Sequence, residues 1–96
     1  MSTVLAEAVA VMTEKLGGRG FDGVAKFVIK GEGSLVIDGA GIRVADDEAD
    51  VTLTASATTF QAIFEGDMNP TAAFMSGKLE VDGNMGIAMK LSAILA

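Results

Sequence analysis

The chain has 96 residues and a mass of 9.8 kDa, a length that accommodates one domain with one core. Half of the residues are apolar and the mean hydropathy is +0.46, so the chain can fold without a partner. It contains no cysteine, histidine, tryptophan or tyrosine, which excludes disulfide frameworks, zinc knuckles and catalysis by cysteine or histidine. We therefore predict a single domain over residues 1–96.

Charge and hydropathy also exclude several kinds of partner. The net charge is −6 and no basic patch is present, which argues against nucleic acid and anionic membrane surfaces. The first sixteen residues lack a basic start and are interrupted by Glu7 and Glu14, so they do not resemble a signal peptide. No run approaches the roughly 20 apolar residues of a membrane span. The sequence predicts a cytoplasmic protein without an integral membrane segment.

An amphipathic helix is predicted at the start of the chain. Its apolar residues recur at spacings of four, three and four and define one buried stripe: Leu5, Val9, Met12 and Leu16. The glycine pair at 17–18 then ends the helix. No Lys-Ser or Lys-Thr pair follows the glycine-rich run at 17–20, so we interpret this run as a flexible connector and not as an anion-binding loop.

Four short strands are predicted between residues 23 and 54, where the apolar period changes to two. Glycine-rich turns at 31–33 and 39–41 join the first three into an antiparallel meander. The acidic run at 46–50 lies before the fourth strand and lacks the spacing of a calcium loop, which favours a solvated turn. One face of the resulting sheet is apolar and needs a cover. The residues predicted on that face are Ala25, Phe27, Ile29, Leu35, Ile37, Ile42, Val44, Val51 and Leu53.

Two short helices are predicted after the fourth strand. Thr58 and Gln61 match a capping box, and the helix that they begin ends at Gly66. The Asn-Pro pair at 69–70 is typical of an N-cap followed by proline in the first turn. It predicts a second helix that stops at Gly77.

The last part of the chain predicts a fifth strand and a closing helix. Residues 78–82 alternate, with Leu79 and Val81 inward, and a helix follows from about Asn84. This closing helix is apolar on nearly all sides, since Lys90 is its only charged residue. Its surplus apolar surface needs a ligand, a second chain or an exposed patch to account for it. Methionines, which repack easily around varied partners, concentrate in the same region: Met68, Met75, Met85 and Met89.

Five segments from the second half of the chain carry motifs that point to a family: residues 49–54 (Ala-Asp-Val-Thr-Leu-Thr), 60–64, 69–70, 73–79 (Ala-Phe-Met-Ser-Gly-Lys-Leu) and 83–91 (Gly-Asn-Met-Gly-Ile-Ala-Met-Lys-Leu). In this order they resemble the sterol carrier protein 2 family. The resemblance covers about residues 23–92 and is most specific over 69–91. It implies an α+β fold with a five-stranded, mostly antiparallel sheet. About four helices would cover one face of the sheet, with an apolar tunnel between the two layers.

The same resemblance implies a noncatalytic function without a cofactor. Members of the family bind fatty acids, fatty acyl-CoA, phospholipids and sterols, so we expect a small-molecule lipid as the partner and no enzyme activity. The alternative is a noncatalytic dimerisation or accessory domain that uses the same apolar face against a second copy or another protein.

The resemblance places eight candidate lipid-binding residues against the tunnel: Phe60, Phe64, Met68, Phe74, Met75, Leu79, Met85 and Met89. The other interpretation of the four methionines among them is ordinary core packing. Three polar residues are the nearest candidates for holding a lipid head group: Gln61, Asn84 and Lys90. Each also has a structural interpretation, because Gln61 can complete a cap, Asn84 can start a helix and Lys90 can extend to water.

Overall fold

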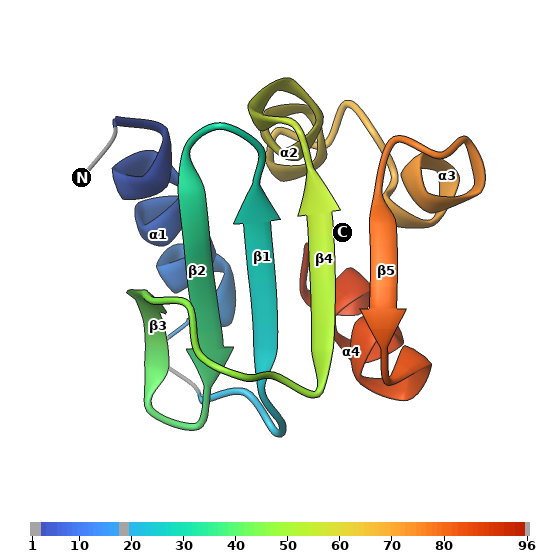
Figure 1. Ribbon diagram of the computed structural model, residues 1–96. Coiled ribbons are helices and arrows are strands. Elements are labelled where there is room, and N and C mark those ends of the chain that lie inside the picture. Colours follow the sequence, from blue (N-terminus) through green and yellow to red (C-terminus); the bar gives the residue numbers. More distant parts are fainter. Residues whose placement is uncertain (1–2, 18–19, 96) are drawn as a thin grey trace.

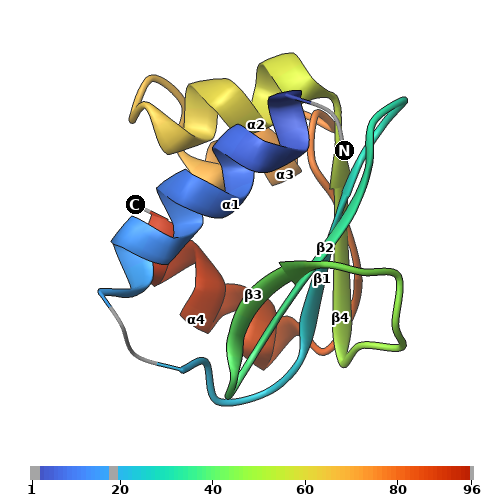
Figure 2. The same cartoon turned by 90° about the vertical axis from the view of Figure 1, so that its left-hand side faces the viewer.

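A computed structural model describes residues 3–17 and 20–95. Two residues of the predicted connector, 18 and 19, lie outside the described part. The chain forms a five-stranded sheet in the order β3-β2-β1-β4-β5 (Figure 1), and its helices all cover one face (Figure 2). In chain order the elements are α1 (Thr3–Leu16), β1 (Ala25–Ile29), β2 (Gly33–Asp38), β3 (Gly41–Val44), β4 (Val51–Ala55), α2 (Ala57–Phe64), α3 (Pro70–Met75), β5 (Glu80–Gly83) and α4 (Met85–Leu95).

The strand pairing confirms the predicted α+β class. β1, β2 and β3 form the antiparallel meander that the two glycine turns predict. β4 lies on the other side of β1 and runs parallel to it, while β5 pairs antiparallel with β4. The sheet is therefore mixed, with one parallel pair among mostly antiparallel ones.

Side-chain alternation puts the core between the sheet and the helices. Every second residue of β1 and β4 is buried, as expected for strands with one covered face. The edge strand β3 departs from the prediction, because Val44 at its end is 44% exposed. In α1 the buried stripe contains Ala8, while Val9 is only half-buried.

Local capping signals explain where the helices begin. Asn69 Oδ1 accepts hydrogen bonds from the backbone N–H groups of Thr71 (2.8 Å) and Ala72 (3.3 Å), which confirms the predicted start of α3. The capping box proposed for α2 is wrong. Ser56, and not Thr58, is the N-cap residue, and its Oγ accepts from the Thr59 N–H at 3.2 Å.

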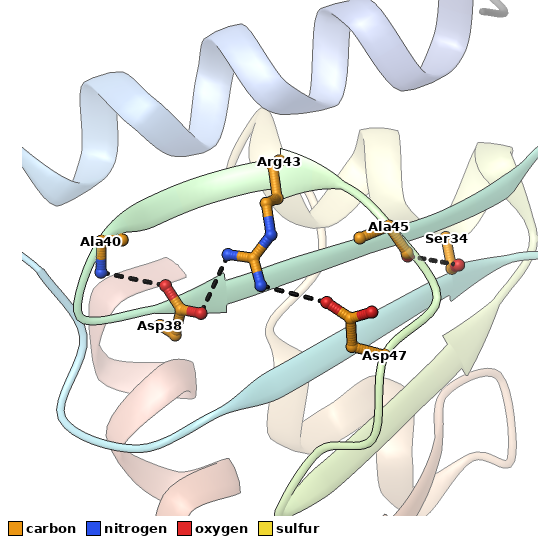
Figure 3. Close-up of polar contacts among 6 residues, drawn as sticks. All are labelled: Ser34, Asp38, Ala40, Arg43, Ala45 and Asp47. Carbon is orange, nitrogen blue, oxygen red and sulfur yellow. Dashed lines mark hydrogen bonds and ion pairs between the residues drawn. The ribbon is translucent and has the colours of Figure 1, made fainter.

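A cluster of polar contacts stabilises the turn between β2 and β3 (Figure 3). The Arg43 guanidinium donates to Asp38 at 2.9 Å and to Asp47 at 3.1 Å, and the Ala40 N–H donates to Asp38 at 2.9 Å. The hydrogen bond from Arg43, followed by that from Ala40, lowers the pKa of Asp38. The bonds to Asp38 and Asp47 raise the pKa of Arg43.

Two other carboxylates of the acidic run at 46–50 also have individual partners. Asp46 accepts from the Lys26 ammonium at 2.9 Å, and Asp50 accepts from the backbone N–H of Val24 at 3.0 Å. Within residues 3–17 and 20–95, no group of three or more acidic side chains is placed to hold a metal ion.

Candidate functional site

A pocket of about 140 Å³ lies between α1 and α2, above β1. In Figure 2 the two helices lie side by side over the sheet, with α1 in front. The pocket is lined by Val4, Glu7, Ala8, Val11, Ile29, Ala57, Phe60, Gln61, Phe64 and Glu65.

Helical spacing brings these residues to the two facing surfaces. The lining residues of α1 lie three, four and seven positions after Val4, and those of α2 three, four, seven and eight positions after Ala57. Residues at such spacings share one face of a helix. Ala8 and Ala57 contribute only a methyl group each, which leaves space between the helices.

Aromatic rings form one wall of the pocket. Phe60 is 2% exposed and meets Phe27 of β1 edge to face, with 5.7 Å between the ring centroids. Phe64 stacks on Phe60 at 6.0 Å. Both geometries are favourable for aromatic pairs, so this wall is apolar and well packed.

The rim of the pocket is polar and acidic. Glu7 of α1, Gln61 of α2 and the α2 C-cap residue Glu65 are all exposed to solvent. The Gln61 side-chain amide donates to Glu65 Oε1 at 3.2 Å. The pocket therefore combines an apolar interior with an opening that carries two carboxylates. Among the described residues that line it, none is a lysine or arginine.

Three of the predicted site residues line this pocket: Phe60, Phe64 and the head-group candidate Gln61. The α1 side of the pocket was missed. Val4, Ala8 and Val11 repeat at helical spacing along α1 and widen its buried stripe, to which Ala8 belongs. This signal could have shown that the apolar face of the helix is broader than predicted.

The remaining lipid-binding candidates lie elsewhere. Leu79 is buried in the core and Met68 packs against it half-buried. Four candidates on α3 and α4 are exposed: Phe74 (42%), Met75 (81%), Met85 (47%) and Met89 (71%). The structure does not bring the eight residues into one cavity, and contact between lipid and these six stays a prediction.

The other two head-group candidates have structural contacts. Asn84 Oδ1 accepts from the Ile87 N–H at 3.1 Å at the start of α4. The Lys90 ammonium lies 3.5 Å from the Asp22 carboxylate, and the two line a separate hollow beside the end of α1. Neither Asn84 nor Lys90 lines the pocket between α1 and α2.

Over residues 3–17 and 20–95, no helix is both long and apolar enough to cross a bilayer.

Comparison with known proteins shows the family to which this chain is similar. A family model for the SCP-2 sterol transfer family matches residues 10–96. Over 81 residues the chain is 41% identical to hydroxysteroid dehydrogenase-like protein 2 of Xenopus tropicalis, covering 76% of this chain and 19% of that protein. Over 53 residues it is 47% identical to human sterol carrier protein 2, covering 55% and 10%. The chain thus spans a fifth or less of the length of these curated relatives.

Solved structures share the whole architecture. Sterol carrier protein 2 of Aedes aegypti in complex with palmitate has a TM-score of 0.80 at 28% identity, covering 100% of this chain and 97% of that one. Sterol carrier protein domain 2 of Helicoverpa armigera has a TM-score of 0.77 at 28% identity, covering 96% and 85%.

Proposed function

Because the chain belongs to the SCP-2 sterol transfer family, we propose that it binds a hydrophobic lipid between α1 and α2 and carries it without chemical change. The observation that carries this proposal is the apolar pocket above β1, walled by Phe60 and Phe64. It occurs in a fold shared with a protein that was solved with palmitate. Each methylene buried there would contribute about 0.8 kcal/mol to binding.

The pocket has to widen to accept a whole lipid. Its volume of about 140 Å³ is below the roughly 300–1,000 Å³ of pockets that enclose drug-sized ligands. α1 takes no part in strand pairing, so it can tilt away from α2 without breaking a hydrogen bond of the sheet. We propose that lipid entry moves α1 and that the sheet stays fixed.

The walls favour flexible aliphatic chains over rigid ring systems. Apart from the Phe60 and Phe64 rings, the interior is formed by small or branched aliphatic side chains, which adapt to a bent chain. Fatty acid, fatty acyl-CoA, phospholipid and sterol-like compounds remain the proposed ligand classes. The cytoplasm remains the proposed location.

Filling the pocket tests the proposal directly. Ala57→Phe adds a ring to a space of about 140 Å³ and should weaken binding of a fluorescent C16 lipid by at least tenfold. Thr58→Phe is the matched control, because Thr58 is the next residue of α2, is exposed and does not line the pocket. We expect Thr58→Phe to bind like the parent protein. Equal lipid binding by all three proteins would contradict a site between α1 and α2, provided that circular dichroism shows each of them to be folded.

A second candidate function rests on the exposed apolar side chains of α3 and α4. Met75 is 81% exposed and Met89 is 71% exposed, and neighbouring large apolar side chains are uncommon on a surface that meets only water. A dimerisation or accessory domain would cover them with a second chain. The two functions differ in their response to lipid and to dilution.

A further inference from the structure

The negative charge of the pocket rim bears on which lipid head groups the site accepts. Resting on the proposed function, we infer that Glu7 and Glu65 make the site selective for lipids with a neutral or cationic head group and discriminate against free carboxylates. Glu7 lies on α1, and Glu65 is the C-cap residue of α2. A head group at the opening therefore meets negative charge from both sides.

The rim offers an anion few side-chain donors. Gln61 is the only uncharged polar side chain among the described lining residues, and one of the two N–H groups of its amide donates to Glu65 at 3.2 Å. A fatty acid carboxylate that accepted from the other N–H would lie beside the Glu65 carboxylate, a group of the same kind of charge. A hydroxyl or ammonium group can instead donate to either glutamate.

Three of the described cations pair with aspartates away from the pocket. Lys26, Arg43 and Lys90 do so at 2.9–3.5 Å, and none of the three lines the pocket. The other described lysines, Lys15, Lys30 and Lys78, do not line it either.

The effect should be moderate and sensitive to salt, because both glutamates are exposed. Each like-charge contact at such a site is expected to weaken binding roughly 1.7-fold to threefold. The repulsion should be screened over about 10 Å at 0.1 M salt. Two rim charges together should weaken binding of an anionic lipid roughly threefold to tenfold relative to a neutral one of equal length.

Three C16 amphiphiles test the inference, because they differ only in the head group: palmitate, hexadecanol and hexadecylamine. Dissociation constants are measured on delipidated protein by displacement of a fluorescent probe, below the aggregation threshold of each lipid. We expect palmitate to bind most weakly. In the Glu7→Gln, Glu65→Gln double variant, the ratio of the palmitate to the hexadecanol dissociation constant should fall roughly threefold to tenfold. Added sodium chloride should lower the same ratio in the unmodified protein.

The matched control is the Glu14→Gln, Glu48→Gln double variant. It removes the same two charges from exposed positions that do not line the pocket, so its ratio should equal that of the unmodified protein. Tightest binding of palmitate, or an equal change in both double variants, would overturn the inference while leaving lipid binding intact. Failure of all three amphiphiles to bind would overturn the proposed function, and the inference with it.

Discussion

At the scale of single residues, the ion pairs at the β2–β3 turn couple stability to pH. Hydrogen bonds from Arg43 and Ala40 hold the pKa of Asp38 below its ordinary value in the folded protein. A carboxyl group with a lowered folded-state pKa stabilises the fold above its unfolded pKa and loses that contribution as the pH falls. The contribution of Asp38 is therefore present at neutral pH and disappears below about pH 4.

Replacing the cation should remove this pH dependence. We expect Arg43→Gln to lower the urea midpoint at pH 7. The difference in urea midpoint between this variant and the unmodified protein should shrink as the pH falls below about 4. Lys78→Gln, which removes an exposed positive charge from the turn before β5, is the control for net charge. Parallel pH profiles for Arg43→Gln and the unmodified protein would show that the Arg43 bonds do not set the acid response.

The N-cap of a helix was predictable from the sequence where only one nearby residue could take that role. Asn69 followed by Pro70 has one plausible role, and the structure confirms it. Ser56, Thr58 and Thr59 all have side chains that can cap a helix, and the capping-box spacing to Gln61 selects Thr58, which is the wrong one. The earlier Ser56 is the N-cap, which leaves Gln61 free to bond Glu65 at the pocket rim.

At the scale of elements, α4 shows what hydropathy does and does not predict. The sequence predicts a helix that is apolar all round, but only one side of it packs inward: Leu91 is 0% exposed and Met89 is 71% exposed. Which side faces the core depends on where β4, β5 and α1 lie. No local pattern contains that information when nearly every position is apolar.

Two alanine substitutions on α4 measure how much a buried and an exposed side chain of this helix contribute to stability. Leu91→Ala empties a fully buried position, so we expect it to lower the free energy of unfolding by about 2–5 kcal/mol. Met89→Ala removes an exposed side chain and should change it by less than about 0.5 kcal/mol. Urea denaturation of the two variants gives both values. Similar losses for both would show that Met89 is covered, as a partner chain would cover it.

The pocket itself illustrates the limit of a family resemblance. The resemblance covers about residues 23–92, and it predicts a five-stranded, mostly antiparallel sheet as well as α2, α3 and α4. α1 lies before that span, yet it supplies Val4, Glu7, Ala8 and Val11 to the pocket. The site forms between segments about fifty residues apart in sequence. Sequence spacing therefore finds the α2 wall and misses the facing one.

At the scale of the whole molecule, the competing functions assign the surplus apolar surface to different partners. A lipid carrier buries it around a ligand between α1 and α2, whereas a dimer buries Phe74, Met75 and Met89 against a second chain. In either case the partner stabilises the native state by mass action. The identity of the stabilising partner therefore shows which surface is used.

Thermal unfolding of delipidated protein with and without hexadecanol makes that distinction. Free lipid at a hundred times its dissociation constant contributes about 2.7 kcal/mol. For a domain of this size, each kcal/mol raises the melting temperature by about 4–8 °C. We therefore expect a rise of roughly 10–20 °C, and a much smaller one in Ala57→Phe, whose pocket is filled. Gel filtration over a hundredfold dilution accompanies the melts. A melting temperature that rises with protein concentration and ignores lipid, together with a dimer that survives dilution, would assign the surplus surface to a second chain, because only bimolecular association makes stability depend on protein concentration.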